Sequence, residues 1–177
     1  MNVTIDNWRL VSTIGSVPAG QGDYHSHARL ADEFDLERSG ELWFVGAGRA
    51  SIEWPEVVVC QRFGPGPDSG FCPGALIASD VATLFLGAGI RLLAYNLQTA
   101  SRLWVDEADT GFGGWRRHGN VVVMSAELEL AAWTTEGDKL WTTFVEPPWS
   151  YDADDTTLRL EVMGNVTRFD LLRGPTT

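Results

Sequence analysis

The feature that most constrains this chain is a tryptophan motif that recurs after 37 residues. When the sequence is shifted against itself by that interval, Ala94 falls on Ala131 and Trp104 falls on Trp141. The apolar runs that precede the two motifs also coincide. Periodicity on this scale is typical of stacked supersecondary units, each of which buries one face against its neighbours. We therefore expect an array of similar small units.

The repeat extends more weakly in both directions along the chain. A second shift by the same interval places Gly137 on Gly174. Upstream, FVGAG at 44–48 matches FLGAG at 85–89 at a shift of 41 residues. The repeating unit is therefore about 37–41 residues long, and at most four such units fit into a chain of 177 residues.

The units have the composition of short β-strands. Runs such as LWFVGA, EVVVCQRF and VVVMSA are rich in β-branched and aromatic residues, which favour strands. At 158–162, apolar and charged residues alternate, as they do in a strand with one face in water. The TEGD segment at 135–138 is typical of a tight turn, with Gly at the position that needs backbone freedom. An antiparallel all-β protein is predicted.

The segment from Ala94 to Trp104 has the pattern A-x-N-x-x-T-A-x-x-x-W. This pattern resembles the tryptophan-docking motif of quinoprotein-type (PQQ-like) β-propeller repeats, A-x-D-x-x-T-G-x-x-x-W. In that family the motif joins the two outer strands of a blade, and its Trp packs against the next blade. Ala94, Thr99 and Trp104 match the motif, whereas Asn96 and Ala100 stand where Asp and Gly are usual.

The resemblance covers about residues 81–174, and each copy of the motif is incomplete. It implies that 81–104 and 118–141 form superposable units, with their two tryptophans in equivalent buried places between units. Burying such an aromatic side chain stabilises a protein by ~1.5–3 kcal/mol. The structural positions of the repeat are then Ala94, Trp104, Ala131, Gly137, Trp141 and Gly174.

The predicted fold is all-β, with antiparallel repeats of about 37–41 residues that form a small or partial β-propeller-like array. A two-sheet β-sandwich is the alternative, because hairpins of this period could also stack in that way. The length suits a single domain over 1–177. Within it we expect an irregular N-terminal segment at 1–40 and a β-repeat region at 41–177. The one candidate helix is 26–40, which begins with a Ser cap and ends at a Gly.

The charge balance argues against one class of partner. The formal net charge is −11 and the pI is near 4.5. Neutralising nucleic-acid phosphates needs clustered Lys and Arg, so we expect no nucleic-acid partner. Two interpretations of the excess acid remain open, namely solubility and an acidic face for a basic partner.

The sequence shows no signal for export or membrane insertion. It begins without a basic leader and apolar core, and no apolar run reaches the ~20 residues of a membrane helix. We therefore expect a cytoplasmic protein that does not enter membranes. Cys60 and Cys72 are too few for a disulfide scaffold, and we expect both to be thiols.

The sequence contains no G-x-S-x-G, no Walker loop and no Ser–His–Asp grouping. Quinoprotein dehydrogenases carry the repeat that this chain resembles, but the chain is too short for their full ring of blades and lacks an adjacent Cys pair. No cofactor is therefore expected. We predict a non-catalytic protein-interaction module or scaffold.

A second pattern indicates a different class of function. His25 and His27 are two residues apart, and Glu33 follows. This spacing resembles the first cupin motif, in which both imidazoles of H-x-H point from a strand to one metal ion and an acid completes the site. The second cupin motif, with its third metal-binding His, is absent. The alternative function is therefore a small cupin-like metal-dependent enzyme that uses His25 and His27.

Two loops that follow the repeated tryptophans, at 110–119 and 147–155, carry aromatic residues among Gly or Pro. A rigid scaffold holds such loops in place, and Trp, Tyr and Arg are the usual energetic centres of interfaces. We hypothesise one partly open groove for a protein partner or a small ligand. The alternative is that the aromatic residues plug the ends of the sheets and the charges pair with each other. The candidate binding residues are Phe112, Trp115, Arg116, Arg117, Trp149 and Tyr151.

Overall fold

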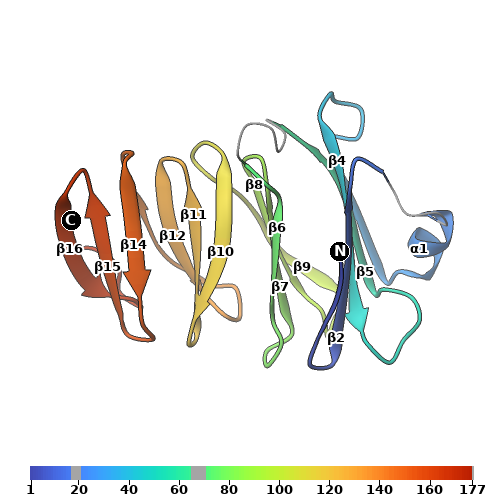
Figure 1. The fold of residues 1–177 in the computed structure, drawn as a ribbon. Helices are drawn as coiled ribbons and strands as arrows, with labels where there is room; N and C mark the ends of the chain where they lie inside the picture. The colour runs from blue at the N-terminus through green and yellow to red at the C-terminus, as the bar shows by residue number, and fades with distance from the viewer. Residues whose placement is uncertain (17–20, 65–70, 177) are drawn as a thin grey trace.

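The computed structural model describes residues 1–16, 21–64 and 71–176. In this part of the chain, sixteen strands and one short helix form four separate sheets that stand side by side in chain order (Figure 1). None of these sheets closes into a barrel. The predicted all-β, partial propeller-like array is confirmed, with four small sheets in place of the two that a sandwich would have.

The second, third and fourth sheets are antiparallel meanders. Each strand pairs with the next one along the chain, because the turns between strands are short. The strands of the second sheet are β6 (Gly74–Ala78), β7 (Thr83–Ala88), β8 (Arg91–Asn96) and β9 (Ser101–Glu107). Those of the third are β10 (Phe112–His118), β11 (Val121–Ala126), β12 (Glu129–Thr134) and β13 (Lys139–Phe144). The fourth has β14 (Trp149–Ala153), β15 (Thr157–Val162) and β16 (Asn165–Asp170).

The repeated tryptophans each pack on a turn of the following sheet. The indole of Trp104 donates a hydrogen bond to the carbonyl of Gly137 at 2.6 Å. The indole of Trp141 donates to the carbonyl of Leu171 at 2.8 Å, and its ring lies against Gly174. Trp141 is buried, whereas Trp104 is only half-buried. The two tryptophans therefore make similar contacts, but the expectation that both are equally buried is wrong.

The first sheet departs from the meander pattern. Its strand order is β1-β2-β4-β5-β3, and its strands are β1 (Asn2–Ile5), β2 (Trp8–Ile14), β3 (Leu30–Phe34), β4 (Glu41–Arg49) and β5 (Val57–Phe63). The irregular N-terminal segment expected at 1–40 is thus wrong, because that stretch supplies three strands. The candidate helix at 26–40 is wrong too, since the helix α1 is Gln21–His27. Strand β3 pairs in parallel with β5, and no local pattern could reveal such a distant partner.

Polar contacts from β3 and the residues before it join the first sheet to the second. The Asp32 carboxylate accepts hydrogen bonds from the Tyr95 hydroxyl and from Arg102, both at 2.9 Å. The Arg29 guanidinium donates to the carbonyls of Gln98 and Thr99. An arginine therefore contacts the turn of the second sheet in the way that tryptophans contact the turns of the later sheets.

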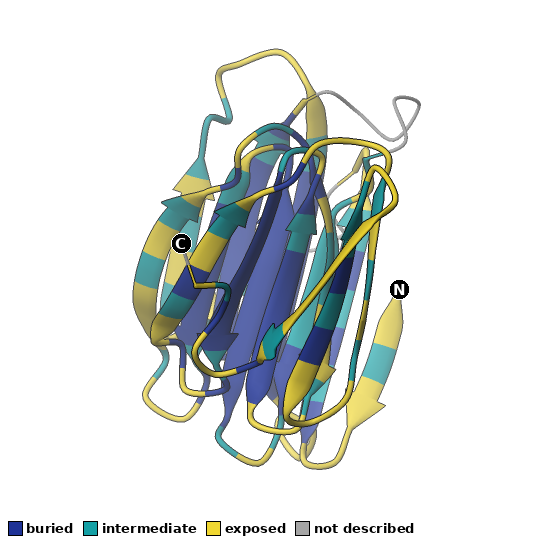
Figure 2. Ribbon diagram, turned by 90° about the vertical axis from the view of Figure 1, so that its left-hand side faces the viewer, coloured by how far each residue is buried: buried dark blue, intermediate teal, exposed yellow. Residues whose placement is uncertain are grey.

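The two ends of the array are covered differently. At one end, Tyr24 of α1 packs on Phe44, and α1 covers the outward face of the first sheet (Figure 1). At the other end, exposed residues alternate with less exposed ones along the strands of the fourth sheet (Figure 2). Its outward face is polar, and Asp152 and Arg168 are among its exposed residues. Polar outer faces are typical of the terminal units of stacked arrays. The described part of the chain contains no helix that is long and apolar enough to cross a membrane.

Candidate functional site

The six candidate binding residues lie on β10 and β14, the first strands of the third and fourth sheets. The expectation that they lie on loops at 110–119 and 147–155 is therefore wrong. The third sheet separates those that face the second sheet from those that lie toward the fourth. Phe112 and Trp115 face the second sheet, where they pack with Phe85, and Trp115 also contacts Trp133. Phe112 is buried and Trp115 is half-buried. These two residues therefore fill the space between the second and third sheets.

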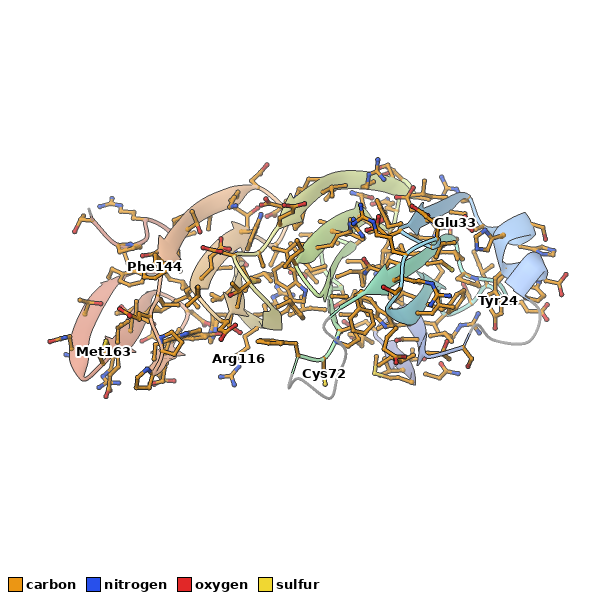
Figure 3. The ribbon with its side chains drawn as sticks, turned by 90° about the horizontal axis from the view of Figure 1, so that it is seen from above. Tyr24, Glu33, Cys72, Arg116, Phe144 and Met163 are labelled. Atoms are coloured by element: carbon orange, nitrogen blue, oxygen red, sulfur yellow. The ribbon has the colours of Figure 1, made fainter. Side chains whose placement is uncertain are left out.

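Arg116 projects from the opposite face of β10, toward the fourth sheet. Its guanidinium carbon lies 5.7 Å from the centroid of the Tyr151 ring. The Tyr151 ring in turn stacks on Trp149, with centroids 6.4 Å apart and planes inclined by 19°. These three side chains form a continuous row, which we call the Arg116–Tyr151–Trp149 row. Arg116 is exposed on the same long edge of the molecule as Cys72 (Figure 3).

Arg117 makes a structural contact and does not join this row. Its guanidinium pairs in a bidentate manner with Asp80, at 2.7 and 2.8 Å, and so ties the third sheet to the second. The hydrogen bond from Arg117 holds the pKa of the Asp80 carboxyl below its usual range and raises the pKa of Arg117. Two-point pairing of this kind is the strongest geometry for an arginine–carboxylate contact.

Two buried polar atoms beside the row have no hydrogen-bond partner within the described residues. They are the hydroxyl oxygen of Tyr151 and Nε2 of His118. The two rings meet edge to face, with centroids 6.2 Å apart. Burial raises the pKa of Tyr151 to about 12, and the charge of Arg116 opposes this shift. Unpaired polar atoms are rare in folded proteins because each one loses its contact with water.

A pocket of about 400 Å³ lies next to Trp149, between the third and fourth sheets. The pairing of β10 with β11 shifts register between Phe112 and Gly114, and Gly113 at this β-bulge is one of the residues that line the pocket. Sequence reasoning did not find this pocket, although the Gly113–Gly114 pair was a visible signal. The lining residues are Phe71, Gly113, Ser125, Ala126, Glu127, Pro147, Pro148 and Trp149.

The histidines proposed for a metal site lie on the helix α1, whereas the cupin-like hypothesis required them to lie on a strand. Residues two apart on a helix point to different sides. His25 therefore lies between Glu33, 3.6 Å from Nδ1, and Cys60, 3.7 Å from Nε2. His27 instead stacks on Trp54. In the described part of the chain, no group of three His, Cys, Asp or Glu side chains could hold a metal ion.

Both cysteines are free. Cys60 lies in the core of the first sheet, and burial together with the nearby Glu33 carboxylate raises its pKa to about 11. A thiol with so high a pKa carries almost no thiolate at neutral pH, so it is a poor nucleophile and a poor metal ligand. Cys72 is exposed.

No known protein family and no curated protein matches this sequence. Among solved structures, the designed protein Ika8 aligns with a TM-score of 0.46 and 13% identity over 76% of this chain and 44% of its own. Hydrazine synthase of Kuenenia stuttgartiensis aligns with a TM-score of 0.46 and 13% identity, over 73% of this chain and 42% of its own. Hsv2 of Kluyveromyces lactis aligns with a TM-score of 0.33 and 12% identity, over 55% of this chain and 32% of its own.

The chain spans less than half of the length of each of these three proteins. Similarity at these scores does not transfer a function, a substrate or a partner.

Proposed function

We propose that this chain is a non-catalytic interaction module that holds a protein partner along the edge formed by β10 and β14. The observation that carries the proposal is the Arg116–Tyr151–Trp149 row. Its members are the residue types that dominate binding energy at protein interfaces. They project from paired strands, which hold side chains more rigidly than loops do, and rigid side chains lose less entropy when they bind.

We further infer that the second and third sheets descend from PQQ-like repeats. Two observations support this inference. The indole N–H of Trp104 donates a hydrogen bond to the carbonyl of Gly137, and the ring of Trp141 packs against Gly174. Both contacts join a motif tryptophan to a motif glycine of the following copy, as the docking motif requires.

We also place the protein in the cytoplasm. The free thiols of Cys60 and Cys72 suit a reducing compartment. A partner there would meet a strongly acidic protein, since the formal net charge is −11. Association with a basic partner is therefore favoured at low ionic strength.

The proposal is tested by co-purification after cross-linking in the native host, with the full chain carrying an affinity tag. Arg116→Ala removes the arginine from the row without adding a charge that would attract a basic partner, and it should remove the partner. Arg168→Ala is the matched control, because Arg168 is also exposed and lies on the polar outward face of the fourth sheet. Loss of the same proteins with both variants, or with neither, contradicts the proposal.

A further inference from the structure

The pocket beside Trp149 has rigid apolar walls. The indole of Trp149 donates a hydrogen bond to the carbonyl of Glu127 at 2.9 Å, which fixes the orientation of its ring. The ring of Phe71 lies so close to Gly111 that a Cβ there would be 2.6 Å from it. Pro147 and Pro148 supply a further wall with little conformational freedom. These contacts hold the apolar residues around the pocket in place.

The floor of the pocket is open because the side chains there are small. Gly113 and Ser125 lie where larger residues would fill the space between the two sheets. The Ser125 hydroxyl makes only a long hydrogen bond of 3.4 Å to the carbonyl of Gly114. The volume of about 400 Å³ exceeds what one long side chain needs and leaves room for a stretch of its backbone.

The rim of the pocket is acidic. Glu127 lines the pocket and is exposed, and it forms no ion pair within the described residues. Glu146 is also exposed and directly precedes Pro147. An apolar slot with a carboxylate at its mouth fits a side chain that has a long aliphatic stem and a cationic end. Lysine and arginine have this shape, and both lay their stems along apolar surfaces while the charge stays in water.

We propose that this pocket accepts a lysine or arginine side chain from an extended segment of the protein partner. The inference rests on the proposed interaction function and names the chemistry of the partner. Charge complementarity supports this occupant, since the exposed Glu127 lines the pocket and the whole chain carries a net charge of −11. The face of the Trp149 indole adds a cation–π attraction when the charge lies near its ring.

The test uses two probes that differ only in charge. Nα-acetyl-lysine N-methylamide and the matching norleucine derivative are titrated into the isotopically labelled full chain. The indole N–H signal of Trp149 is followed by NMR. We expect the lysine probe to shift this signal saturably, with a dissociation constant in the millimolar range that is typical of a single side chain. The norleucine probe should bind at least about fivefold more weakly, because it makes no ion pair.

Two pairs of variants locate the binding. Glu127→Gln should weaken the binding of the lysine probe about fivefold, which is the upper range for an exposed ion pair. Glu53→Gln changes an exposed acid elsewhere and should leave the binding of the probe unchanged. Ser125→Leu should fill the pocket and abolish the shift, whereas Ser125→Ala keeps the space and should retain it. The remaining signals of the spectrum show that each variant is folded.

The results separate this inference from the proposed function. Equal binding of the two probes would assign the pocket to an uncharged apolar ligand and overturn the inference. An unmoved Trp149 signal would do the same. If Arg116→Ala removes the partner while the lysine probe does not bind, the interaction module stands and only the pocket assignment fails.

Discussion

Trp141 and Gly174 are packed so closely that a Cβ built on Gly174 would lie 2.4 Å from Cγ of the indole. The glycine also has a φ of 74°, a backbone conformation that other residues adopt at a cost. The contact joins β13 of the third sheet to the turn that follows β16 of the fourth. Two residues that are 33 positions apart thus hold adjacent sheets together.

Gly174→Ala should therefore lower the free energy of unfolding by about 2–4 kcal/mol, the sum of an overpacked contact and a strained φ. Urea denaturation followed by tryptophan fluorescence measures the change. Gly164→Ala is the matched control, because Gly164 has a φ of 84° with no atom within 4 Å of the new Cβ. It should cost only about 1 kcal/mol. Equal losses at the two positions would show that the tryptophan contact contributes nothing.

The burial of the two repeated tryptophans predicts different energies. Trp141→Ala should cost about 3–5 kcal/mol, as other truncations of buried aromatic side chains do. Trp104→Ala should cost less, because Trp104 is only half-buried and part of its surface already meets water. Comparing the denaturation midpoints of the two variants tests this order. The reverse order would mean that the ring stacking of Trp104 on Trp133 outweighs the difference in burial.

Acid should loosen the contacts between sheets. Hydrogen bonds from Arg91 and Arg117 hold the pKa values of Asp35 and Asp80 below their usual range. Because the folded-state pKa values are lowered, this stabilisation is present above the unfolded-state value of about 4 and is lost as the pH falls through the folded-state values. Thermal stability should therefore decrease below about pH 4. Asp80→Asn should flatten that decrease, and an unchanged profile would contradict the assignment.

The two thiols should react at very different rates. Cys72 is exposed and should react with a thiol reagent within the mixing time at pH 8. Cys60 is buried, its pKa is raised to about 11, and it should react only after unfolding in denaturant. Counting released chromophore before and after adding denaturant measures both phases. Two fast equivalents in the native protein would show that the helix α1 does not cover Cys60.

Local sequence patterns were sufficient for the repeated units at 81–104 and 118–141, although β10 of the third sheet was expected to be a loop. In a meander each strand pairs with its neighbour along the chain, so the pattern of apolar runs and turns contains the topology. The resemblance to the tryptophan-docking motif implied that Trp104 and Trp141 each contact the next copy. Their unequal burial was not predictable, because it depends on which side chains the neighbouring sheet presents.

The N-terminal third of the chain could not be predicted in this way. The burial along β3 alternates as in a strand, with Leu30, Asp32 and Phe34 half-buried, yet β3 finds its partner β5 more than twenty residues later and pairs with it in parallel. The resemblance to the cupin motif likewise put His25 and His27 on a strand, where the structure has the helix α1. Their real positions on α1 send the two imidazoles to different neighbours and remove the basis for a shared metal ion.

The sequence by itself determined the kinds of residue at the candidate site, but it predicted loops where the structure has the strands β10 and β14. Only the tertiary structure decided which face each one occupies. Phe112 and Trp115 are three residues apart, which would put them on opposite faces of a regular strand. The bulge between Phe112 and Gly114 adds one residue and returns both to the same face, so Arg116 alone of the three is left to meet Tyr151. A bulge is set by the pairing of β10 with β11, and the sequence of one strand does not specify how its partner aligns.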